Sequence, residues 1–165
     1  MKRYRYAAIA AVIGLVTSTS FALAAVNVGD KAPSFETITI DGNKAGVSDL
    51  ALGKSLLIVF WATWCPNCKG DIPKIKALNE VYGPKGLRVL GINAGVNDSM
   101  EKTERYIKAF HVSYPIVFDK DSVITKSFGV SGVPTVFLID KTGTIKYRGN
   151  IVPDNIVDML EQARK

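Results

Sequence analysis

Cys65 and Cys68 are the residues whose type and spacing most directly indicate chemistry in this sequence. They are the only two cysteines of the 165-residue chain, and two residues separate them. A disulfide between them would close a ring too short to add much stability by restricting the unfolded chain. Two thiols at this spacing can instead alternate between dithiol and disulfide forms. We therefore predict a redox-active Cys65–Cys68 pair with no metal and no cofactor.

The segments around the pair predict a strand followed by a helix. Residues 56–61 form an unbroken apolar run, which is typical of a strand buried on both faces. Apolar residues then recur at helical spacing; they are Ile72, Ile75, Leu78 and Val81. Pro73 lies inside this pattern, so the helix either starts late or is kinked there.

This order places Cys65 where the helix begins. Free N–H groups and the helix dipole at that end favour a thiolate, which is the form that attacks a disulfide. Cys68 lies one helical turn later and is expected to be less exposed. We predict that Cys65 is the nucleophile and that Cys68 resolves the resulting mixed disulfide.

The other elements alternate between strand and helix patterns. Alternation at period two over residues 35–40, followed by Asp41 and Gly42, indicates a strand and a hairpin turn. Further strands are predicted over residues 87–93, 114–118, 135–139 and 144–149, and further helices over 122–128 and 153–164. The segment Asn97-Asp98-Ser99 offers an N-cap for another helix that ends near Phe110. The pattern predicts an α/β fold whose mixed central sheet is flanked by helices.

Three sequence segments resemble the thioredoxin superfamily. Residues 60–68, FWATWCPNC, are similar to its active-site segment, and Pro73 matches the proline that kinks its first long helix. The segment Gly132-Val133-Pro134-Thr135 resembles its cis-proline loop, which faces the dithiol and binds the partner chain through backbone hydrogen bonds. The resemblance implies a thioredoxin fold, with Trp64, Pro66, Val133 and Pro134 contacting the substrate protein.

The central part of the chain narrows the resemblance to a subgroup. Residues 97–129 are longer than plain thioredoxin needs and are similar to the central αβ insertion of the TlpA/ResA-like exported proteins. We also expect this chain to carry an N-terminal strand or hairpin extension to the thioredoxin fold. Members of the subgroup commonly keep the cysteines of partner proteins reduced, often in cytochrome c maturation. The resemblance implies a protein-disulfide reductase acting on cysteine-containing exported proteins, such as apocytochrome c, and re-reduced by a membrane or periplasmic donor.

Two positions depart from the family pattern. Thioredoxin has a buried Asp six residues before the first cysteine, where this chain has Val59. ResA-like proteins have a Glu three residues after the second cysteine, where this chain has Asp71. We predict that Asp71 assists proton transfer at Cys68; the alternative is an acidic residue that only stabilises the helix dipole.

The first 24 residues have the pattern of a secretory signal peptide. A basic start is followed by an apolar run over residues 7–16 and by a tail of small residues that ends in Ala22-Leu23-Ala24. We predict cleavage after Ala24, a domain over residues 25–165, and a periplasmic or otherwise exported protein. An uncleaved N-terminal membrane anchor is the alternative.

Charge and cysteine spacing exclude several other functions. Without residues 1–24 the net charge falls from +6 to +3, and the remaining basic residues form no stripe that would indicate nucleic-acid binding. A monomer is expected. The peroxiredoxin pattern has Thr and Pro at the positions where this chain has Ala62 and Ile58, so peroxidase activity is not expected. An oxidase or isomerase of the same fold remains open, as does a copper chaperone that binds Cu(I) through the two thiolates.

Overall fold

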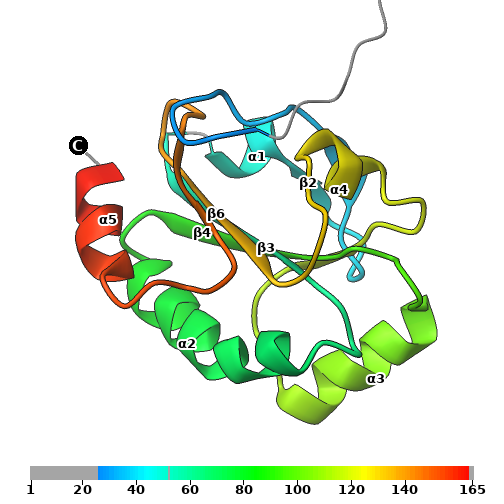
Figure 1. Cartoon of the computed structure of the whole chain (residues 1–165). Coiled ribbons are helices and arrows are strands. Elements are labelled where there is room, and N and C mark those ends of the chain that lie inside the picture. The colour runs from blue at the N-terminus through cyan, green and yellow to red at the C-terminus, as the bar shows by residue number, and fades with distance from the viewer. Residues whose placement is uncertain (1–25, 52, 164–165) are drawn as a thin grey trace, which may run out of the picture.

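A five-stranded mixed sheet forms the centre of the molecule (Figure 1). The computed structural model describes residues 26–51 and 53–163 of the chain. The strands lie in the order β5-β4-β3-β6-β7; they are β3 (Ser55–Trp61), β4 (Leu87–Asn93), β5 (Ile116–Phe118), β6 (Thr135–Ile139) and β7 (Ile145–Gly149). Strands β3, β4 and β5 are parallel, whereas β6 and β7 run antiparallel to their neighbours. The predicted mixed α/β sheet is confirmed.

Strand β3 is buried along its whole length because both faces of the sheet are covered. Its alternate residues enter two separate hydrophobic cores. Leu57, Val59 and Trp61 belong to one core, which includes residues of α2 (Pro66–Tyr82) and α5 (Ile156–Ala163). The other core contains Leu56, Ile58 and Phe60 and is built around three packed phenylalanine rings. The apolar run over residues 56–61 therefore reflects burial on two sides.

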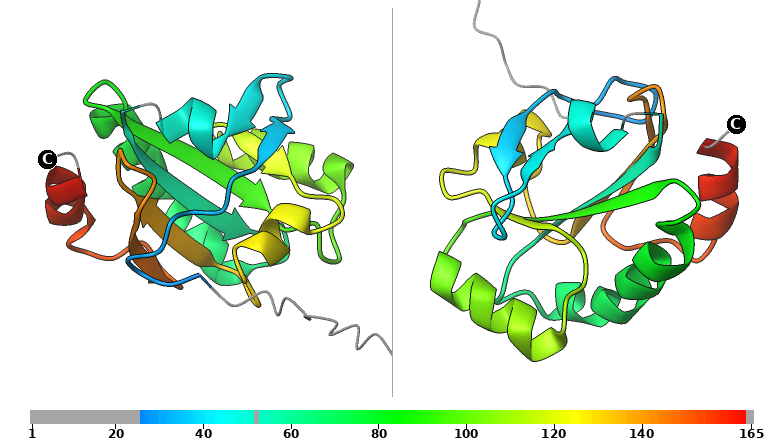
Figure 2. Two further views of the ribbon diagram at one scale, coloured as in Figure 1. Left: turned by 90° about the horizontal axis from the view of Figure 1, so that it is seen from above. Right: turned by 180° about the vertical axis from the view of Figure 1, so that it is seen from behind.

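The helices are divided between the two faces of the sheet. Helices α2, α5 and α3 (Met100–Phe110) cover one face, while α1 (Val47–Ala51) and α4 (Val123–Ser127) cover the other (Figures 1 and 2). Of these five helices, the short α1 was not predicted. Within the described residues, no helix combines the length and the apolar character needed to cross a membrane.

An N-terminal hairpin lies on the same face as α1 and α4 (Figure 2). Strands β1 (Glu36–Ile38) and β2 (Lys44–Gly46) pair antiparallel, and Gly42 adopts a positive φ of 84° in the turn between them. The predicted hairpin extension is confirmed. The alternation predicts that the apolar Ile38 faces the core and that the polar Thr39 faces solvent. The structure shows the reverse, because Ile38 is 64% exposed and Thr39 is buried.

Two predicted helix boundaries need correction. Helix α2 begins at Pro66, directly after Cys65, with Pro73 in its interior, so a late start is wrong. Its predicted core position Val81 is exposed. Helix α5 begins at Ile156 and not at Pro153, whose carbonyl instead accepts a hydrogen bond from the Ile156 N–H in the preceding turn.

Candidate active site

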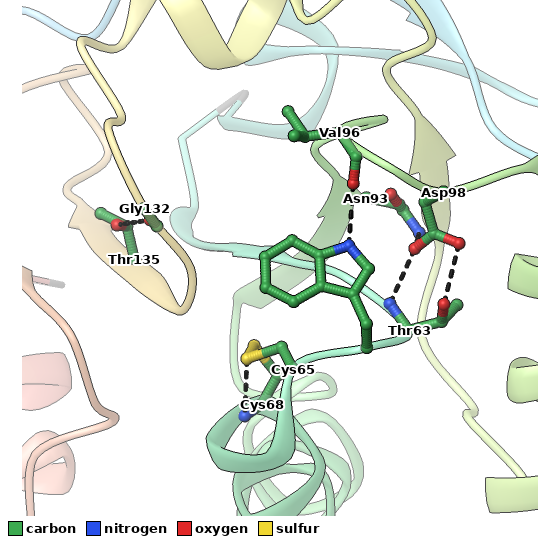
Figure 3. The surroundings of a disulfide bond; sticks show 9 residues. Thr63, Cys65, Cys68, Asn93, Val96, Asp98, Gly132 and Thr135 are labelled. Carbon is green, nitrogen blue, oxygen red and sulfur yellow. Dashed lines mark hydrogen bonds between the residues drawn. A yellow bond between two sulfur atoms is a disulfide. The ribbon is translucent and has the colours of Figure 1, made fainter.

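Cys65 and Cys68 lie at the junction between β3 and α2 and form a disulfide (Figure 3). Cys65 is the N-cap of α2, and its Sγ accepts a hydrogen bond of 3.2 Å from the main-chain N–H of Cys68. Pro66 takes the first helical position, where the missing N–H costs no helical hydrogen bond. The first sulfur therefore lies at the positive end of a 17-residue helix, which favours a thiolate after reduction.

The two cysteines do not differ in exposure in this disulfide-bonded form. Each residue is 4% exposed, and both belong to the core cluster that contains Val59, Trp61 and Val136. The expectation that Cys65 is the more exposed of the two is therefore wrong for the oxidised state. Nothing in their exposure separates the nucleophile from the resolving thiol, and only their order on the helix does so.

The loop before β6 lies opposite the disulfide, as predicted (Figure 3). The Val133–Pro134 peptide bond is cis, and Thr135 Oγ1 donates a 2.6 Å hydrogen bond to the Gly132 carbonyl oxygen. Pro134 is buried, Val133 is half-buried and Gly132 is exposed. Trp64, Gly132 and Val133 line a pocket of about 120 Å³. Trp64 itself is 52% exposed, so the pocket is accessible to another protein.

Sequence reasoning missed a hydrogen-bond network that holds the residues just before Cys65. Asp98 accepts hydrogen bonds from the Thr63 main-chain N–H at 2.7 Å and from the Thr63 hydroxyl at 2.8 Å. The fully buried Asn93 donates to the same carboxylate at 2.8 Å (Figure 3). Burial tends to raise the pKa of Asp98, but these bonds outweigh it and hold the pKa below its ordinary value. Local patterns in the sequence indicated only a helix cap at this point.

Asp71 lies one turn beyond Cys68 on α2 and outside the first turn of that helix, so the alternative of an acidic residue that stabilises the helix dipole is wrong. It is half-buried, and its Oδ2 is buried without a hydrogen-bond partner among the described residues. Burial raises its pKa, while the main-chain N–H of Val152 and the charge of Lys74 act in the opposite direction. Burial is therefore the largest influence on this carboxyl, and it favours the protonated form.

The position of thioredoxin's buried acid is filled by an apolar side chain. Val59 is 3% exposed and lines a small void together with Cys68, Ile72 and Tyr114. Burial, with smaller contributions from Tyr106 and Asp71, strongly raises the pKa of Tyr114. The residue that replaces the acid of thioredoxin therefore supplies no proton-transfer group beside Cys68.

The chain matches known proteins over most of its length. The model of the AhpC/TSA family matches residues 28–148. Thiol-disulfide oxidoreductase ResA of Geobacillus thermodenitrificans is 32% identical over 142 residues, which cover 85% of this chain and 80% of that protein. Thioredoxin-like protein YneN of Bacillus subtilis is 34% identical over 125 residues, covering 73% of this chain and 70% of that protein.

Solved structures agree with these sequence matches. A thiol:disulfide interchange protein of the thioredoxin family from Chlorobium tepidum superposes with a TM-score of 0.68 at 25% identity. The match covers 86% of this chain and all of that one. The thioredoxin fold, the C-x-x-C pair at the start of α2 and the cis-proline loop agree with this relationship. The chain therefore belongs to the AhpC/TSA family and is a ResA-like thiol–disulfide oxidoreductase.

Proposed function

We propose that this oxidoreductase is an exported protein-disulfide reductase that acts through the dithiol form of Cys65 and Cys68. The observation that carries the proposal is the position of Cys65 at the N-terminus of α2, opposite the cis-Pro134 loop, in a chain similar to ResA. Cys65 attacks the disulfide of a partner protein, and Cys68 then attacks the mixed disulfide. The partner leaves with two thiols, and the Cys65–Cys68 disulfide remains for a donor to reduce.

The surface around the pair supports a protein substrate. Trp64 and Pro66 are exposed on the helix side, and the edge of the cis-Pro134 loop is accessible at Val133. An extended chain placed between them can form backbone hydrogen bonds with the loop while its disulfide meets Cys65. Cysteine-containing exported proteins, including apocytochrome c, are the proposed substrates, and a membrane or periplasmic dithiol protein is the proposed donor.

The reduction potential of the pair tests the direction of electron flow. We expect equilibration with glutathione to give a value below about −200 mV, on the scale where protein disulfide isomerase lies near −180 mV. A value close to about −120 mV, where DsbA lies, would instead make the protein an oxidase. Mass spectrometry after alkylation at each glutathione ratio measures the dithiol fraction directly.

We also propose that residues 1–24 are a signal peptide, although these residues lie outside the described structure. The basic start, the short apolar run and the tail of small residues support it. Fractionation of the producing cells and N-terminal sequencing test it. A mature protein that begins at Ala25 in the exported fraction is expected, whereas an intact N-terminus in the membrane fraction would indicate an anchor.

A further inference from the structure

The loop from β4 to α3 is bonded to both residues that immediately precede Cys65. Asp98 binds Thr63 through the two hydrogen bonds described above. The indole N–H of Trp64 donates a 2.8 Å hydrogen bond to the Val96 carbonyl oxygen of the same loop (Figure 3). These contacts join segments that are more than 30 residues apart in the sequence. The two residues before the nucleophile are thus held by two residues of the β4–α3 loop, Val96 and Asp98.

Asp98 is itself fixed to the rigid part of the fold. Its Oδ2 accepts the bond from Asn93, which is the last residue of β4, and its Oδ1 accepts a 3.0 Å bond from the Ser99 N–H. Asn93 also donates to the buried Thr103 hydroxyl of α3 at 2.8 Å. The carboxylate therefore connects the active-site segment to both β4 and α3, and each of its oxygens accepts two hydrogen bonds.

We propose that Asp98 is a positioning residue that holds Thr63, and through the main chain the adjoining Trp64 and Cys65, in register with the cis-Pro134 loop. The proposal applies in either direction of electron flow, because both directions need Cys65 aligned with a partner disulfide. A displacement of about 1 Å at a reacting group can lower a rate by about 100-fold. The four hydrogen bonds to the Asp98 carboxylate restrict the movement of Thr63 and so prevent such a displacement.

Asp98→Asn tests the proposal with little change in side-chain shape. An amide has one oxygen and places N–H groups where the other oxygen accepted two bonds, so at least two of the four bonds are lost. We expect kcat/KM for reduction of a disulfide-containing peptide, with dithiothreitol as the reductant, to fall about tenfold or more. Tryptophan emission should shift to longer wavelength, because the Trp64 indole is no longer held against the Val96 carbonyl.

Asp140→Asn is the matched control at the opposite end of β6. Asp140 is buried, whereas Asp98 is half-buried, and like Asp98 it accepts several hydrogen bonds: from the N–H and hydroxyl of Thr142 and from the Thr144 N–H. It lies far from the cysteines along the strand, so its loss should lower the melting temperature and leave kcat/KM within about twofold. Equal losses of kcat/KM in both variants would show that Asp98 has only a structural role and would overturn the proposal.

Thr63 provides a second pair of variants in case Asp98→Asn does not fold. Thr63→Val keeps the shape and the main-chain N–H but removes the hydroxyl bond to Asp98, whereas Thr63→Ser keeps that bond. We expect kcat/KM of Thr63→Val to fall several-fold, with most of the loss restored in Thr63→Ser. Equal activity of the valine and serine variants would contradict the proposal.

Discussion

Two aspartates flank the cysteine pair, and their surroundings are opposite. Asp98 accepts four hydrogen bonds, and its pKa is held below the ordinary value. Asp71 keeps one buried oxygen without a partner among the described residues, and burial raises its pKa. A fully bonded carboxylate keeps its charge and its position, whereas a poorly bonded one can take up a proton. We therefore propose a positioning role for Asp98 and a proton-transfer role for Asp71.

The largest expected effect concerns the two cysteines themselves. In Cys68→Ser, the mixed disulfide on Cys65 cannot be resolved, so covalent adducts with partner proteins should accumulate on non-reducing gels. Cys65→Ser should lose exchange activity, by about 1000-fold or more, and form few adducts. More adducts in the Cys65 variant than in the Cys68 variant would show that Cys68 is the nucleophile and Cys65 the resolving thiol.

Asp71→Asn should change how the reaction depends on pH. If Asp71 exchanges a proton with Cys68, the loss of its carboxyl should slow the attack of Cys68 on the mixed disulfide by about tenfold or more near neutral pH. The shape of the pH–rate profile should also change, because a titrating group has been removed. Stopped-flow measurement from pH 5 to pH 9 provides the test.

The Asp98→Asn variant provides the contrast for that measurement. Its rates should fall at every pH with little change in the shape of the profile, because a positioning group does not exchange protons. An unchanged profile in Asp71→Asn would show that the Asp71 carboxyl takes no part in proton transfer. A profile altered only in Asp98→Asn would exchange the roles proposed for the two sides.

Val59→Asp would restore the acid that thioredoxin has beneath the pair. An unpaired carboxyl at this buried position should lower the free energy of unfolding by about 2–4 kcal/mol, measured by urea denaturation. In a protein that also carries Asp71→Asn, it should return part of the lost rate at neutral pH. A double variant no faster than Asp71→Asn alone would show that a carboxyl at position 59 cannot reach Cys68.

The smallest expected effect concerns the pH dependence of folding stability, to which the two aspartates should contribute with opposite sign. The low pKa of Asp98 means that its contribution is present above the ordinary pKa of Asp and is lost as pH falls through the folded-state value. Asp98→Asn should therefore destabilise the protein near pH 7 and matter less in acid. Its lost bonds are worth about 1–2 kcal/mol.

Asp71 should behave in the opposite way. Its raised pKa means that the folded state holds the proton more tightly, so the folded state loses stability as pH rises from the unfolded pKa through the folded one. Asp71→Asn should therefore slightly raise the melting temperature near pH 7. A lower melting temperature at neutral pH would indicate that the Asp71 carboxylate makes favourable contacts in the folded state.

The sequence was most informative where a local pattern determines the structure. A strand of apolar residues followed by C-x-x-C predicted the position of Cys65, and Ser99 is the N-cap of α3 with its hydroxyl accepting from the Lys102 N–H. The cis bond before Pro134 followed from the family resemblance. These features depend on a few neighbouring residues or on a recognisable motif, and local physics is sufficient for them.

Contacts between distant segments could not be predicted in the same way. Asp98 was interpreted as part of a helix cap, yet its carboxylate binds Thr63, which is 35 residues earlier. The equal burial of the two cysteines also depends on how β6 and its loop pack over α2. Such features require the tertiary arrangement, because hydropathy patterns do not specify which polar groups meet across the sheet.

The covered disulfide described above has a consequence for the selectivity of electron flow. Exchange requires a thiolate to approach a sulfur in line, so the access route controls the rate as strongly as the potential does. With both cysteines 4% exposed, small thiols in solution meet a shielded bond, whereas a protein that docks against Trp64 and the cis-Pro134 loop can open a path to it. We therefore expect small thiols to reduce this disulfide more slowly than a donor protein that docks on the same surface.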